Sequence, residues 1–322
     1  MLSRNDFTEN RMDPLSDVLT LLDATSYPAP GIMAPEDWGL HFPGSDGLLW
    51  FSVLKGGARI CSGVEHEWQT LHQGEAVILP GRARFAITTL TGKVRGRAET
   101  APHQLTGNRA DYGGDHLILG CGKMVVEPGA GFLLLGELPP AIYLRTGSPV
   151  ASMCNGLMEG NAISGPGHAA ITGHVLQVLM IEGIRGWLAR GVDHQPGWLS
   201  ALRDPRLLDV MSAMHQAPAQ NWTLPALAKI AGMSRAGFAR RFSTQAGCSP
   251  LNYLARWRMH LAGKALRTTA MPVKEIGFNL GYGCESAFSS AFRRIHGCSP
   301  VSYRSGCASG FTDQKLMARP IP

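Results

Sequence analysis

The sequence predicts an α+β protein of two domains, an N-terminal β-barrel followed by an all-α domain that contains two helix-turn-helix units. Strand-like runs dominate residues 38–145, and a block of sequence between 238 and 303 occurs twice. From Ser200 onward the chain holds 16 Lys and Arg against 5 Asp and Glu, whereas the first 199 residues hold 14 against 19. A basic domain joined to an acidic one is the charge pattern of a nucleic-acid-binding module with a partner domain.

The first domain is expected to span residues 12–165. Hydrophobic runs follow one another here, among them LLWFSVLKGGARI, AVILPGRARFAITTL and DHLILGCGKMVV. Gly and Pro separate the runs, which favours a small antiparallel barrel or sandwich over alternating strands and helices. An amphipathic helix is then expected from about residue 169 to 190, with Val175, Leu179, Ile184 and Leu188 near one side.

The second domain contains a repeat at an offset of 50 residues. The sequence FARRFSTQAGCSPLNY is matched by FSSAFRRIHGCSPVSY. A repeat at fixed spacing indicates one supersecondary unit used twice, and two copies are too few for a solenoid. A duplicated module within one domain is therefore expected. The matching residues are Phe238, Phe242, Gly247, Cys248, Ser249, Pro250 and Tyr253, which recur as Phe288, Phe292, Gly297, Cys298, Ser299, Pro300 and Tyr303.

Each copy has the pattern of a helix-turn-helix. In the first, LPALAKIA predicts a short amphipathic helix that Gly232 ends, and Ser234 is expected to cap the next helix. In the second, VKEIGFNL predicts the first helix, and Gly281 and Gly283 bracket the turn. The phenylalanines lie one helical turn apart and are expected to fill the core. They serve function only by fixing which face of the second helix points outward, into a DNA major groove.

Residues from about 206 to 304 resemble the DNA-binding domain of AraC/XylS-type transcription regulators. The resemblance is carried by WTLPALAKIAGMSRAGFARRF, GCSPLNYLARWRM, VKEIGFNLGYGCESAFSSAF and GCSPVSYR. It implies a domain, placed at 204–305, that sets two recognition helices into successive major grooves. A joining helix over 251–267 would be ~25 Å long at ~1.5 Å per residue. Residues 306–322 are expected to be a disordered tail.

The phase of the phenylalanines predicts which side chains face DNA. Arg240 is the expected base-reading residue, because a guanidinium can bond O6 and N7 of guanine together; the alternative is a phosphate contact. Glu285 could accept from cytosine N4 or only stabilise its helix N-terminus. The family often carries arginine where this chain has Ser290. The expected DNA-facing residues are Ser234, Arg235, Ala236, Ala239 and Arg240 on the first helix, and Glu285, Ser286, Ser289, Ser290 and Arg293 on the second.

The first domain is similar, more loosely, to the cupin-like sensor domain that precedes many AraC-type DNA-binding domains. GEAVILPGRARFAI, at residues 74–87, resembles the second half of a cupin motif, and HLILGCGKM and LLLGELPPAIYL extend the likeness. In related regulators a helix such as 169–190 pairs two subunits, so residues 166–200 are assigned to dimerisation and linkage. The alternative is that this helix packs on its own barrel.

A metal-dependent cupin enzyme is the remote alternative. Such a site needs converging histidines and a carboxylate, commonly with an H-x-H pair. This sequence has no H-x-H; His66 and His72 share one side of a strand only if it is continuous, and Arg82 and Arg84 follow Pro80 instead of histidine. No catalytic residues, metal ligands or cofactors are therefore expected.

The seven cysteines form no C-x-x-C pair. Cys121 is the redox candidate, because a cysteine at this place occurs in relatives that respond to oxidants. The partner thiol such sensing needs would have to be Cys61 or Cys154, and a buried structural role for Cys121 is the alternative. Cys284 begins the second recognition helix, where the helix dipole would lower its thiol pKa. Without a signal peptide or 18 consecutive apolar residues, the protein is expected to be soluble, reduced and cytoplasmic, with no membrane partner.

These observations predict a homodimeric transcription regulator, with activation as its expected role. A signal in the barrel would change how two recognition helices occupy double-stranded promoter DNA or contact RNA polymerase. The effector is either a small organic ligand or, in the alternative, an oxidant acting on Cys121.

Overall fold

The computed structural model describes residues 13–21, 24–45, 47–62, 67–81, 83–99, 101, 104–106, 109–125, 132–147, 168–190 and 196–306. The described residues divide into two compact units, a β-rich one and a helical one, which confirms the predicted two-domain α+β fold. The β-rich unit holds strands β1–β12 and helix α4 (His168–Arg190), and the helical unit holds α1 and α5–α12. The predicted tail lies outside the described residues after residue 306.

The β-rich unit consists of two sheets whose inner faces share one hydrophobic core. A seven-stranded sheet has the order β12-β6-β3-β11-β1-β10-β9, and a five-stranded sheet has the order β5-β4-β7-β2-β8. Most pairs are antiparallel; β1 with β10 and β2 with β8 are parallel. The strands are β1 (Thr25–Ala34), β2 (Gly39–Phe42), β3 (Leu48–Lys55), β4 (Gly57–Ser62), β5 (Trp68–His72), β6 (Ala76–Pro80), β7 (Phe85–Thr89), β8 (Gly96–Arg97), β9 (Gln104–Thr106), β10 (Arg109–Asp111), β11 (Leu117–Val125) and β12 (Ile142–Leu144). A short helix, α2 (Phe132–Leu135), precedes β12.

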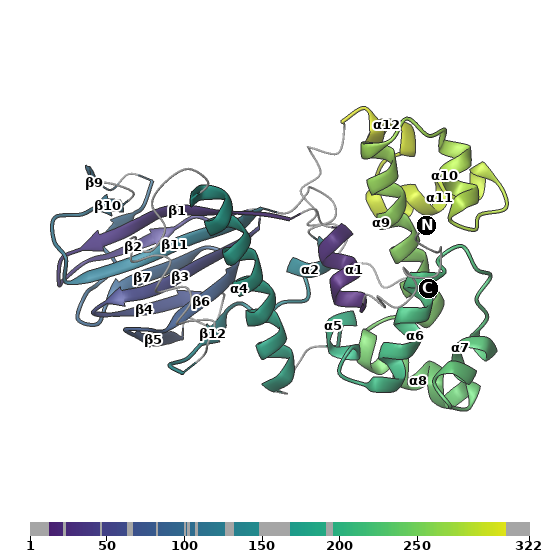
Figure 1. Ribbon diagram of the computed structural model, residues 1–322, viewed down its shortest axis with the longest axis horizontal. Helices are drawn as coiled ribbons and strands as arrows, with labels where there is room; N and C mark the ends of the chain where they lie inside the picture. The colour runs from purple at the N-terminus through teal and green to yellow at the C-terminus, as the bar shows by residue number, and fades with distance from the viewer. Residues whose placement is uncertain are drawn as a thin grey trace, which may run out of the picture. The chain divides into compact units, whose positions relative to one another are not determined.

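The outer face of the seven-stranded sheet is covered by α4 (Figure 1). Trp50 on β3 pairs with Gly122 on β11 and with Ile78 on β6, so these three residues form a row across the sheet. Glycines allow the helix to lie close: a Cβ on Gly122 would come 3.0 Å from the side chain of Leu176, and one on Gly183 would come 2.4 Å from Ile78 Cδ1. The alternating side chains of β3 are therefore buried on both faces, inside the core and under α4.

One face of α4 packs on its own barrel. Leu179 and Ile184, two of the four residues expected on its apolar side, are fully buried. Ile171 and Val178, seven residues apart, lie on the opposite face with 46% and 50% of their surfaces exposed. The helix therefore has an exposed stripe, on which Ile171 and Val178 lie together with His174, Glu182 and Arg185.

The helical unit contains both predicted helix-turn-helix units, placed along α9 (Figure 1). Phe238, Phe242, Phe288 and Phe292 are fully buried, as predicted. Its helices are α5 (Trp198–Ala201), α6 (Pro205–Gln216), α7 (Leu224–Ile230), α8 (Arg235–Ala246), α9 (Pro250–Thr268), α10 (Val273–Asn279), α11 (Glu285–His296) and α12 (Pro300–Arg304). The first unit is α7 with α8, and the second is α10 with α11.

The ends of the recognition helices follow from single residues. Ser234 caps α8 by accepting from the amide of Gly237 at 3.2 Å, as the sequence predicted. Gly247 and Gly297 end α8 and α11 in the left-handed conformation, with φ of 69° and 75°. The glycine of each G-C-S-P sequence is thus required where the chain turns into the next helix.

Helix α1 (Pro14–Leu21) belongs to the helical unit, although the sequence predicts a first domain over residues 12–165. Val18 and Leu21 are 1% and 3% exposed, and the helix contacts α6 and α9. Asp17 Oδ2 lies 3.0 Å from Nδ1 of His215 on α6, and Lys264 on α9 donates to the carbonyl of Thr20 at 3.0 Å. Sequence position alone did not reveal this placement, because the helix is separated from its partners by almost 200 residues.

Candidate nucleic-acid interface

The outward face of α8 carries the side chains that the sequence predicted to meet DNA. Ser234, Arg235, Ala236 and Arg240 are exposed, and Ala239 is half-buried. Within the described residues, no hydrogen bond or ion pair holds the guanidinium of Arg240. An exposed, unengaged guanidinium on the second turn of such a helix is suited to bidentate hydrogen bonding.

Arg241, next to it, is engaged within the protein. Its Nε donates to Asp204, which is buried and caps α6 by accepting from the amide of Arg206. The sequence could not separate two adjacent arginines by function. The structure separates them, because among the described residues Arg241 has a carboxylate partner and Arg240 has none.

The second recognition helix presents a smaller and more polar face. Glu285, Ser286, Ser290 and Arg293 are exposed, and Ser289 is half-buried. Serine side chains reach less far than arginine, so Ser290 offers a shorter contact than Arg240 does on α8. Which of these residues touch bases stays a prediction.

Cys284 stands immediately before α11 and is exposed. Its sulfur lies 3.3 Å from the hydroxyl of Ser286. The hydrogen bond with that hydroxyl, followed by the backbone amide of Ala287, lowers the thiol pKa. The lowering expected from the helix N-terminus is therefore present, with a side-chain donor as its largest cause.

Aromatic stacking joins the first helix-turn-helix to α9. The ring of His215 lies 3.8 Å from that of Trp257, with 3° between their planes, and its Nε2 is 2.7 Å from the hydroxyl of Tyr253. Tyr253 also packs edge-on against Phe242 of α8, with 5.9 Å between ring centroids. These contacts anchor α8 on the N-terminal half of α9.

The second unit packs on the C-terminal half of α9, where the buried His260 meets the half-buried His296. His260 on α9 is 8% exposed, and its ring centroid is 5.4 Å from that of His296 on α11. Burial, followed by the nearby charges of His296, Arg256 and Arg267, holds the pKa of His260 well below its usual value. The Nδ1 atom of His260 is buried and has no hydrogen-bond partner among the described residues, a feature that its place in the sequence does not reveal.

The whole helical segment is strongly basic. Residues 196–306 contain 14 Lys and Arg and four Asp and Glu, and Arg241 neutralises one of those carboxylates, that of Asp204. Such a surplus gives affinity for the phosphate backbone that falls as salt is raised.

The core of the β-rich unit is apolar and aromatic. The side chains of Trp38, Phe42, Phe51 and Phe85 meet there, with ring centroids 5.1 to 6.3 Å apart. The indole Nε1 of Trp38 is buried and has no partner among the described residues. This interior is suited to apolar contacts and offers one unused hydrogen-bond donor.

Cys121 is part of that core. Only 5% of its surface is exposed, and burial raises the pKa of its thiol to about 12. Cys61, on β4 in the other sheet, has a thiol pKa that burial also raises. Both are free thiols, and Cys154 lies outside the described residues. At neutral pH Cys121 is therefore protonated and poorly nucleophilic.

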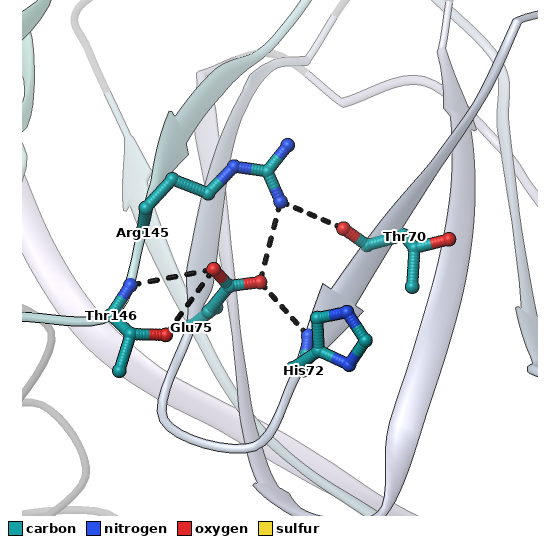
Figure 2. A network of polar contacts seen from close by, with 5 residues as sticks. All are labelled: Thr70, His72, Glu75, Arg145 and Thr146. Carbon is teal, nitrogen blue, oxygen red and sulfur yellow. Dashed lines mark hydrogen bonds and ion pairs between the residues drawn. The ribbon is translucent and has the colours of Figure 1, made fainter.

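A buried carboxylate ties the end of β12 to the turn after β5 (Figure 2). Glu75 Oε2 accepts from the amide of His72 at 2.9 Å and from Arg145 at 3.3 Å. Its Oε1 accepts from the amide of Thr146 at 3.3 Å. Burial acts to raise the pKa of Glu75, but these donors together hold it below the usual value. All of these contacts are internal, which makes Glu75 a structural carboxylate.

The residues weighed for a metal do not come together in the described part of the chain. There, no three His, Cys, Asp or Glu side chains are grouped to hold an ion. His72 is exposed at the end of β5, and Arg84 is exposed before β7. His66 and Arg82 lie outside the described residues. Among the helices described, none is long and apolar enough to cross a membrane.

Comparisons with known proteins cover both units. A family model of helix-turn-helix domains matches residues 227–306, and a cupin family model matches residues 13–189. A Streptomyces antibioticus protein described as an AraC-like transcription regulator is 32% identical over 304 residues, 91% of this chain and 98% of its own. The RCS-specific HTH-type transcriptional activator RclR of Escherichia coli is 28% identical over 91% of this chain and 97% of its own. The crystallised DNA-binding domain of AdpA, in complex with a target DNA, is 32% identical over 32% of this chain and 92% of that one, with a TM-score of 0.31.

Proposed function

The chain belongs to the AraC-type family of DNA-binding transcription regulators, and we propose that it activates transcription by placing α8 and α11 in two neighbouring major grooves of promoter DNA. The observation that carries this proposal is the duplicated helix-turn-helix along α9, with Arg240 exposed and unengaged on the first recognition helix. Arg240 would read guanine, and Glu285, Ser286, Ser289 and Ser290 would supply weaker contacts from the second helix. Arg235 and Arg293 would contact phosphates, which position the helices without reading sequence.

The test is to find which fragments of the organism's genome the full-length protein retains at physiological salt. We expect enrichment of sites with two short blocks about ten base pairs apart, one for each recognition helix. Binding that is equal on all fragments and falls with salt would contradict sequence-specific reading by these helices.

We propose that the β-rich unit receives the signal as a small, largely apolar organic ligand. Its core supplies aromatic contacts and one buried donor, Trp38 Nε1, so the ligand would carry a hydrogen-bond acceptor. The burial of Cys121 favours this class over an oxidant that reacts with that thiol. Changing Cys121 to Ser separates the two, because a ligand sensor should keep its response and a thiol sensor should lose it.

We propose a binding role for the β-rich unit and no catalytic one. Glu75, its buried carboxylate, accepts hydrogen bonds from the amides of His72 and Thr146 and from Arg145, so its oxygens are engaged within the protein. Metal analysis of the purified protein tests the enzymatic alternative. A stoichiometric bound transition metal would favour a cupin enzyme attached to a DNA anchor.

The signal would reach the helical unit through α1. Described β1 begins at Thr25, four residues after α1 ends at Leu21, so only a short stretch of chain would separate a change in β1 from a helix that packs against α6 and α9. Changing Val18 to Asp would place a charge in this packing and should make promoter binding independent of the signal. Thr20 to Asp is the matched control, because Thr20 is exposed on the same helix. Equal signal responses in both variants would contradict coupling through α1.

The regulator would act as a homodimer in the cytoplasm, with RNA polymerase as its partner at the promoter. The E. coli relative is named an activator, which supports activation over repression. The dimer contact would use the exposed stripe of α4 that contains Ile171 and Val178. Reporter expression from the identified promoter, with and without the gene, gives the sign of regulation.

A further inference from the structure

Arg258 on α9 contacts the segment that leads into the first helix-turn-helix unit and also the turn of the second. Its Nε donates to the carbonyl of Pro218 at 2.6 Å, and its Nη2 donates to the carbonyl of Gln220 at 2.9 Å. Both carbonyls belong to the segment 217–223, which joins α6 to α7. One guanidinium thus holds the approach to the first unit at two points.

The same guanidinium contacts the turn of the second unit. Its Cζ lies 5.8 Å from the ring centroid of Tyr282, and that ring is 5.6 Å from the ring of Phe288 on α11. Gly281 beside it has φ of +83°, and a Cβ there would lie 2.4 Å from the carbonyl oxygen of Ala219. The turn of the second unit therefore meets the segment 217–223 directly, with Arg258 packed at the contact.

Internal hydrogen bonds hold the segment 217–223 up to the start of the first unit. The indole of Trp222 donates to the carbonyl of Ala217 at 3.0 Å, and the amide of Gln220 donates to the same carbonyl at 3.1 Å. Thr223 then caps α7 by accepting from the amide of Ala226 at 3.3 Å. A displacement of the carbonyls that Arg258 holds would therefore be passed on to α7 and its partner α8.

We propose that Arg258 is a positioning residue that fixes the angle between α8 and α11, and through it the spacing between the two DNA half-sites that the protein accepts. The two recognition helices also pack on opposite halves of α9 through apolar and aromatic contacts, and Nε2 of His296 on α11 lies 2.9 Å from the carbonyl oxygen of Met259 on α9. Apolar packing has little directional preference, whereas hydrogen bonds from a planar guanidinium to two carbonyls are directional. This inference rests on the proposed function, because it presumes that both helices read DNA.

The experiment selects binding sites from randomised DNA with the full-length protein and its Arg258→Gln and Arg258→Lys variants. Arg256→Gln is the matched control, because Arg256 is exposed on the same helix and the change removes the same charge. The wild type and the control should enrich two blocks at one spacing. Both Arg258 variants should enrich the same two blocks at several spacings, and the ratio of affinities between the best spacing and one displaced by a base pair should fall about tenfold.

The outcomes separate this inference from the proposed function. A wild type that enriches no two-block site contradicts the proposed function itself. A wild type with one spacing and a folded Arg258→Lys protein with the same single spacing overturn the role of Arg258. If Arg258→Gln does not fold, Arg258→Lys serves as the test variant, because lysine keeps the charge and the aliphatic stem. If neither variant folds, Arg258 is needed for stability, and the proposal is overturned as well.

Discussion

Arg241 donates through Nε to the buried carboxylate of Asp204, and the neighbouring Arg240 has no such partner within the described residues. Asp204 also caps α6, so Arg241 joins the first recognition helix to the helix that precedes the whole module. Two adjacent residues of the same type therefore have different roles. One holds the scaffold, and the other is available to DNA.

Changing Arg240 to Ala should reduce discrimination between specific and non-specific DNA by about 1–3 kcal/mol, with no loss of fold. Changing Arg241 to Ala should instead destabilise the helical unit by about 1–3 kcal/mol, because Asp204 loses its charged donor. Binding to specific and scrambled DNA, together with thermal unfolding, checks both. An Arg240 variant with an unchanged preference for its site would contradict its assignment to base reading.

The exposed and buried thiols should differ strongly in reactivity. Cys284 should be alkylated first, because it is exposed and a hydrogen bond lowers its pKa, whereas Cys121, with a pKa of about 12, should react only on unfolding. Mass spectrometry after timed treatment with iodoacetamide measures both rates. Bound DNA should protect Cys284, since it begins α11. Fast modification of Cys121 in the folded protein would support the oxidant-sensing alternative.

Acidification should weaken the helical unit through His260. Its pKa in the folded protein lies well below the ordinary 6.5, so the unfolded chain binds a proton that the folded state excludes. The stability conferred by the neutral ring is therefore complete above pH 6.5 and is lost below it, with a slope of up to about 1.4 kcal/mol per pH unit. Denaturant unfolding between pH 5 and 8 measures this slope. Changing His260 to Leu should remove the contribution of His260 to this pH dependence of the unfolding free energy. The pH dependence that remains includes a contribution from His215, because burial lowers the pKa of that residue as well.

A charge on the exposed stripe of α4 should prevent dimerisation. Val178 is 50% exposed and lies opposite the face that packs on the barrel, so Val178 to Glu should leave the fold intact and bury an unpaired carboxylate in any contact formed there. Analytical ultracentrifugation of the Glu variant should then find monomers. The control variant, Val178 to Thr, keeps the shape of the side chain and should still form dimers. Dimers that persist in the Glu variant would place the contact elsewhere.

Local patterns predicted the helical unit well. The repeat of phenylalanines and glycines predicted both helix-turn-helix units, and the structure confirms the burial of Phe238 and the predicted cap formed by Ser234. Such features depend on residues within one or two turns of each other, and sequence spacing describes them fully. Apolar residues at helical spacing also predicted the helix at 169–190. They did not predict which of its faces packs on the barrel, because apolar residues lie on both faces.

What the sequence by itself determined is the family, the order of the two domains, the outward face of each recognition helix and the basic charge of the second unit. Tertiary structure alone decided that α1 packs with the helical unit, that Arg241 rather than Arg240 pairs with Asp204, that Cys121 is buried, and that Arg258 touches both helix-turn-helix units. The physical reason is distance along the chain. Each of these features joins groups 24 to almost 200 residues apart or depends on burial within the folded core, and such contacts leave no periodic trace in the sequence.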